Sequence, residues 1–96
     1  MAKLLLREKS IYGDGSIMDL VVWGIPESEK YPDAVRYRLA FIARGGERPA
    51  VLYDNHYPKG HHKHIGKDEM PYHYRDIETL FKDFDDDVLE VRRENI

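Results

Sequence analysis

The chain has 96 residues, of which 42% are hydrophobic and 34% are charged, and its net charge is −3. This length and balance predict one globular domain, residues 1–96, with a modest core and no room for a second. Because the sequence contains no cysteine, a disulfide framework, a thiolate nucleophile and a cysteine-ligated zinc site are excluded.

The first third of the chain predicts a hairpin. Residues 3–11 and 16–25 have the composition of strands, and Gly-Asp-Gly at 13–15 supplies turn residues between them. The apolar run near the N-terminus is only three leucines long, so we expect neither a signal peptide nor a membrane span, and a cytoplasmic protein. Residues 26–33 form a polar surface loop with a proline near each end.

The middle of the chain predicts two more strands. Apolar side chains alternate with basic ones, including Arg36 and Arg38, over residues 35–44, which indicates a half-buried antiparallel strand. Gly45-Gly46 then turns the chain into a fourth strand at 49–55. Four strands joined by short turns predict an antiparallel meander.

The last third predicts a loop followed by one helix. Residues 55–71 show no sustained period and contain two prolines and two glycines, so we expect mostly loop, with a short extended piece possible at 61–65.

Asp76 has the chemistry of a helix cap. The helix carries one apolar stripe, Ile77, Leu80, Phe81, Phe84, Val88 and Val91. Its acidic residues, Asp83, Asp85, Asp86 and Asp87, are expected to be solvated. The predicted fold class is α+β, a four-stranded antiparallel meander with a C-terminal α-helix packed on one face.

A histidine cluster is the strongest chemical signal in the sequence. All five histidines fall between His56 and His73, and three are consecutive or nearly so at 61, 62 and 64. On an extended backbone His62 and His64 point to the same side, about 6 to 7 Å apart. One neutral imidazole can then take a proton while a protonated one gives a proton, which is the chemistry that cleaves RNA through its own 2′-hydroxyl.

Local charge and aromatic residues support a nucleic-acid substrate. Residues 35–67 hold seven basic and two acidic residues, a net charge of +5 inside an acidic molecule. The candidate phosphate contacts are Lys59, Lys63, Arg36 and Arg38. Tyr53 and Asp54 are candidate orienting groups in the catalytic set, and Tyr72 is a candidate for stacking on a base. The alternative is that these charges are ordinary solvated groups on strand faces.

Two other uses of the histidines stay open. His-x-His on one strand is a metal-ligand spacing, with Asp54 or His73 as a third donor, although the flanking lysines oppose a dication. The basic segment is also consistent with a noncatalytic module that binds nucleic acid or an acidic protein. Our first hypothesis is a metal-independent endoribonuclease without a cofactor.

The order of motifs along nearly the whole chain resembles a known family. The residues that carry the resemblance are Tyr53-Asp54-Asn55, Lys59-Gly60-His61-His62-Lys63-His64-Ile65-Gly66, Pro71-Tyr72-His73-Tyr74 and Leu80-Phe81-Lys82-Asp83-Phe84, with the N-terminal hairpin and Arg36-Tyr37-Arg38-Leu39. They are similar to the TumE family of small bacterial and archaeal toxins. The resemblance implies the toxin of a type II toxin–antitoxin pair, with RNA as its target and a helix-turn-helix antitoxin of the Xre type as its partner; a homodimer stays open.

The family pattern maps onto this chain position by position. Its Gly-x-His-x-His element falls on Gly60, His62 and His64, and its Tyr-Asp-Asn element falls on residues 53–55. Position 61 departs from the pattern, because this chain has His61 where the family usually has Asp. If that carboxylate orients an imidazole or binds a cation, this member differs from its relatives in rate.

Overall fold

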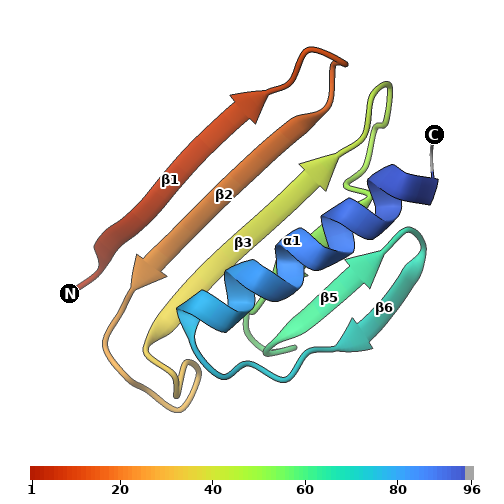
Figure 1. Cartoon of the computed structure of the whole chain (residues 1–96). Coiled ribbons are helices and arrows are strands. Elements are labelled where there is room, and N and C mark those ends of the chain that lie inside the picture. Colours follow the sequence, from red (N-terminus) through yellow and green to blue (C-terminus); the bar gives the residue numbers. More distant parts are fainter. Residues whose placement is uncertain (95–96) are drawn as a thin grey trace.

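The protein is one antiparallel sheet of six strands with a single helix across one face (Figure 1). The computed structural model describes residues 1–94, so the last two residues of the predicted domain lie outside the described part. The elements are β1 (Lys3–Ile11), β2 (Ile17–Gly24), β3 (Val35–Ile42), β4 (Val51–Asp54), β5 (His62–Ile65), β6 (Asp68–Pro71) and α1 (Ile77–Glu94). The α+β class and the C-terminal helix are confirmed. The number of strands is corrected from four to six.

The two additional strands lie in the segment that was predicted to be mostly loop. β5 and β6 form a hairpin in which Ile65 pairs with Asp68 and His62 pairs with Pro71. Each strand has only four residues, which is too short for an alternating pattern to stand out from noise. The turn between them is Gly-Lys, and Gly66 has a φ of 60°. A glycine with positive φ at the first position of a two-residue loop is typical of hairpins.

β3 divides the molecule into two faces, as its alternating sequence predicts. Val35, Tyr37 and Leu39 are buried beneath the helix, whereas Arg36 and Arg38 are exposed on the opposite side of the sheet. We call the helix-bearing side the covered face and the other side the open face. Because side chains alternate along a strand, every strand of the sheet contributes to both faces.

The helix begins where the sequence predicts, and its stripe packs on the sheet. The Asp76 carboxylate accepts a hydrogen bond from the Thr79 backbone N–H at 2.7 Å, which satisfies a free amide of the first turn. Leu80, Phe84 and Val88 are buried against the covered face. In Figure 1 the helix runs over the β3 to β5 part of the sheet, and β1 and β2 extend beyond it. No helix among residues 1–94 is long and apolar enough to cross a membrane.

The acidic side of the helix needs a partial correction. Asp86 forms the expected surface ion pair with Lys82 at 2.8 Å. Asp83, in contrast, accepts a hydrogen bond from the Tyr72 hydroxyl at 2.6 Å. Asp87 accepts from the Tyr53 hydroxyl and from Lys63 Nζ, which lies 3.0 Å away. Two of the four aspartates therefore fasten the helix to the sheet.

Candidate functional site

The register of the sheet brings the chemistry-bearing side chains together on the open face. Residues directly opposite each other on neighbouring strands project to the same side. One row across β3, β4 and β5 is Arg38, Asp54 and His62, and the next row across β4, β5 and β6 is Leu52, His64 and Glu69. The two histidines therefore share a face, as the sequence predicts, and the register places Arg38, Asp54 and an acid from β6 on that same face.

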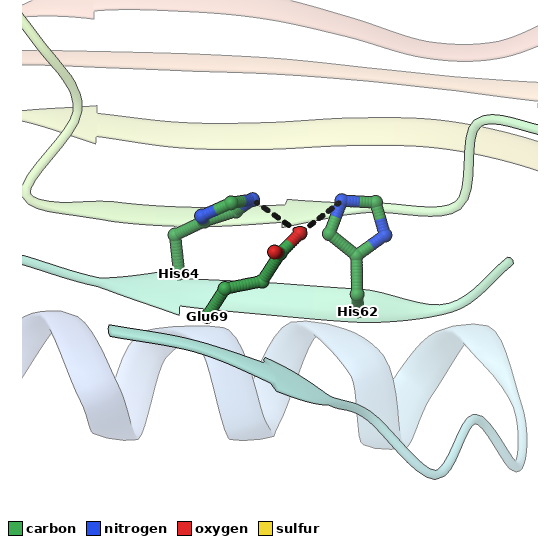
Figure 2. Close-up of side chains that lie close together, drawn as sticks. All are labelled: His62, His64 and Glu69. Carbon is green, nitrogen blue, oxygen red and sulfur yellow. Dashed lines mark ion pairs between the residues drawn. The ribbon is translucent and has the colours of Figure 1, made fainter. Parts of the chain in front are cut away.

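Glu69 lies between the two imidazoles (Figure 2). Its Oε1 is 3.5 Å from His64 Nε2 and 4.0 Å from His62 Nε2. The two rings are 5.2 Å apart between centroids and nearly perpendicular, at 77°. Their Nε2 atoms thus converge on one small region above the β5–β6 hairpin.

A hydrogen bond to the backbone fixes the orientation of the His62 ring. Its Nδ1–H donates to the Gly60 carbonyl at 2.7 Å, because a carbonyl can only accept. This bond leaves Nε2 of the neutral ring with a lone pair, and it directs that lone pair toward Glu69. The His62 residue is 9% exposed, whereas the His64 side chain keeps 30% of its surface. A bound molecule can therefore reach His64 more easily than His62.

Lys59 also contacts the acid. Its Nζ lies 2.5 Å from Glu69 Oε1, and this charged hydrogen bond lowers the pKa of Glu69 below its ordinary value, with smaller contributions from His64 and His62. The Lys59 side chain is 60% exposed, so the contact is a surface ion pair. Glu69 is ionised in this surrounding, and it offers a negative oxygen to both imidazoles.

A shallow hollow of about 440 Å³ lies on the open face beside Asp54, the β4 partner of His62. Its wall includes Trp23, Arg36, Arg38, Asp54 and His56. The Arg36 guanidinium donates to His56 Nδ1 at 3.1 Å, and Asp54 accepts from the His56 backbone N–H at 2.6 Å. Two guanidinium groups and an exposed indole, 37% accessible, give this hollow the means to hold a phosphate and an aromatic ring.

Three of the predicted site residues lie on the covered face instead. Tyr53 is completely buried in the core, where its ring meets Phe84 edge-on at 5.5 Å. Lys63 pairs with Asp87, and Tyr72 donates to Asp83 on the helix. The structure therefore separates these side chains from His62 and His64 by the thickness of the sheet, and it gives all three a role in holding the helix.

His61 also lies on the covered side. Its Nε2 is 2.8 Å from Asp33, its Nδ1 is 3.0 Å from the Tyr37 hydroxyl, and its ring stacks on Tyr74 with centroids 4.6 Å apart. The residue that departs from the family pattern thus belongs to a cluster behind the sheet. It does not contact the His62 and His64 pair.

Two residues of the open face were missed by sequence reasoning. The sequence does not reveal Glu69, because residues 68–71 show no strand pattern and only the hairpin register places it opposite His64. The Gly-Lys turn was the signal that could have revealed the pairing. Trp23 belongs to no motif of the sequence, and its ring is exposed beside Arg36, its partner in the β2–β3 register.

The histidines and Glu69 form a group of three potential metal ligands within residues 1–94. Their donor atoms all lie within 4.8 Å of one another. Asp54 and His73, the third donors considered from the sequence, are not part of this group. The cluster can therefore either move protons or hold a cation, and both uses depend on the same Nε2 lone pairs.

Comparison with known proteins agrees with the sequence motifs. A family model described as toxin TumE matches residues 1–92 of the chain. Among curated proteins and among solved structures, the search found no match. The matched range includes every residue of the open-face cluster.

Proposed function

Because the chain belongs to the TumE toxin family, we propose that it is a toxin that cleaves RNA on its open face, and that an antitoxin encoded beside it keeps it silent. The family supports the toxin role. The observation that carries the proposal for RNA is the convergence of two imidazole Nε2 atoms next to a cationic hollow.

The two histidines take opposite roles in the proposed reaction. His62 is the base, since its Nδ1–H is committed to Gly60 and its Nε2 is free to accept the 2′-hydroxyl proton. The 2′-oxygen then attacks phosphorus and the bond to the 5′-oxygen breaks. His64, as imidazolium, gives that leaving oxygen its proton. The products are a 2′,3′-cyclic phosphate and a free 5′-hydroxyl, and no metal is needed.

The surrounding groups position the substrate and stabilise the transition state. Arg38 and Arg36 hold the phosphate and neutralise charge that grows on it, as guanidinium forks do for phosphoryl oxygens. Trp23 offers a stacking surface for a splayed base, which suits single-stranded RNA. Glu69, 3.5 Å from His64, orients that ring. Lys59 is a further phosphate contact once it turns away from Glu69.

The experiment follows cell growth and RNA integrity. We expect expression of the chain alone to arrest growth and to fragment RNA, and co-expression with the neighbouring gene to restore growth. The purified protein should cleave single-stranded RNA in the presence of EDTA. His62→Ala and His64→Ala should each reduce that rate by roughly 10²- to 10⁴-fold.

His73→Ala is the matched control, because His73 is an exposed histidine outside the open-face cluster. Its rate should equal that of the wild type. Equal rates for all three alanine variants would remove the catalytic assignment. For the partner, we propose a helix-turn-helix antitoxin of a type II pair, and a neighbouring gene of another kind that fails to restore growth would contradict it.

A further inference from the structure

We propose that His62, His64 and Glu69 also form a binding site for one divalent transition-metal ion, and that the bound ion switches off proton transfer at the same imidazoles. The binding half of this inference rests on geometry alone. The inhibitory half rests on the proposed function, since it requires the histidines to be the acid and the base.

The first argument is the spacing of the donor atoms. His62, His64 and Glu69 each offer one donor atom, and these three atoms all lie within 4.8 Å of one another. Glu69 Oε1 is 3.5 Å from His64 Nε2 and 4.0 Å from His62 Nε2. Bonds of about 2.0 to 2.1 Å at tetrahedral angles place zinc ligands about 3.3 Å apart. Small side-chain rotations close the remaining gap, and the paired strands hold the three Cα atoms in place.

The second argument is the support behind His62. A metal-binding histidine usually donates its other ring N–H to a carbonyl or a carboxylate, which fixes the tautomer and aims the lone pair at the ion. The bond from His62 Nδ1–H to the Gly60 carbonyl, at 2.7 Å, is such a support. The His62 ring is therefore oriented for coordination.

The third argument is the kind of donor. Two imidazoles and one carboxylate suit zinc and other first-row divalent ions, whereas calcium and magnesium prefer oxygen ligands only. Three protein ligands leave a position open for water. Because His64 is partly exposed, that open position faces solvent.

Lys59 is the residue that opposes the ion. Its ammonium group pairs with Glu69 Oε1 at 2.5 Å, and this is the oxygen that the metal would bind. The side chain is 60% exposed and can turn into solvent, so the opposition lowers affinity without closing the site. Lys59→Met should therefore tighten metal binding, which a purely structural role for Lys59 does not predict.

The test titrates zinc into the full-length, untagged protein after treatment with EDTA, by calorimetry. We expect one ion per chain for wild type and for His73→Ala. His64→Ala and Glu69→Gln should bind about 100-fold more weakly or worse, since losing even a supporting group costs about 10- to 100-fold. Cobalt(II) should give the absorption of a low-symmetry site with nitrogen ligands, and thermal melts should show that the variants fold.

The outcomes separate the two proposals. No zinc binding, or equal binding by His64→Ala and Glu69→Gln, overturns the metal site. Zinc that binds and accelerates RNA cleavage overturns its inhibitory role, whereas zinc that stops cleavage until EDTA restores it supports both halves. If zinc binds stoichiometrically and the metal-free protein never cleaves RNA, the metal site stands and the acid–base function falls.

Discussion

Neighbouring residues in and just before β5 project to opposite faces of the sheet. His62 and His64 face the open side, while His61 and Lys63 face the helix or the loop before β3. The division continues on β4, where Asp54 faces the hollow and Tyr53 is part of the core. Residues that are neighbours in the sequence therefore face opposite sides of the sheet. Those on the open face form the candidate site, and those on the covered face hold the helix and the core together.

Tyr53 provides a direct check of this sorting. Burial, reinforced by its hydrogen bond to Asp87, raises the pKa of the Tyr53 phenol well above its usual range, so the group stays neutral and acts as a donor. Tyr53→Phe should lower the free energy of unfolding by about 1 kcal/mol, the typical worth of one hydrogen bond. Denaturant unfolding measures this loss. RNA cleavage should be unchanged, and a loss of cleavage without a loss of stability would place Tyr53 in the site.

His61→Asp introduces the residue that the resemblance leads us to expect at this position, and it tests the same separation. The new carboxylate would lie near Asp33 and lose the stacking on Tyr74, so we expect a lower melting temperature. RNA cleavage by the folded variant should match the wild type, because His61 does not contact the His62 and His64 pair. A cleavage rate that rises severalfold would show that position 61 reaches the reaction.

Among the secondary-structure elements, the sequence predicts those that are long enough to show a repeating pattern of apolar and polar residues. β1 to β3 have eight or nine residues each, and the helix has eighteen with a clear stripe and a cap at Asp76. β5 and β6 have four each. Their pairing depends on one turn and on contacts with β4, which are distant in sequence. The shared face of His62 and His64 was predictable from alternation, whereas Glu69 required the register.

The helix cap gives a prediction with a pH dependence. Hydrogen bonds from the Thr79 backbone N–H, and then from its side chain, lower the pKa of Asp76 below its ordinary value of 3.8. A lowered pKa in the folded state means that this contribution to stability is complete above 3.8 and is lost as the pH falls through the lowered value. Asp76→Ala should therefore melt below the wild type at neutral pH, and the difference should shrink in acid.

Asp76→Asn is the control for this experiment. Asparagine caps helices about as well as aspartate and carries no charge, so the variant should keep most of the neutral-pH stability and lose the pH dependence. Melting curves at several pH values would measure both effects. A gap between Asp76→Ala and wild type that widens in acid would contradict the assignment.

For the whole molecule, charge is divided between the two sides of the sheet. The helix on the covered face carries seven acidic and three basic residues, so it is more negative than the entire chain. The open face presents Arg36 and Arg38 beside the histidines. Under the proposed function, an RNA strand would be repelled from the covered face and attracted to the open face, which would give it one productive direction of approach.

Salt dependence should reveal this direction. Each phosphate contact that is lost should reduce the slope of log K against log salt by about 0.7 for single-stranded RNA. We expect Arg38→Ala to show such a reduction and Arg93→Ala, on the helix beside Glu90, to show none. Both substitutions would be made in the inactive His64→Ala variant, and RNA binding by each protein would be measured at several salt concentrations. Equal slopes for both variants would mean that RNA binds elsewhere.

The short β5 strand has one further consequence for how such a chain can change over time. Its even-numbered positions lie on the open face and its odd-numbered positions lie on the covered face, so a single inserted or deleted residue between Gly60 and Gly66 would exchange the two sets. The two imidazoles would then lie on the covered face, and Lys63 would lie on the open face. A register shift within the strand would therefore remove both imidazoles from the open face and disturb the packing of the covered face in the same event.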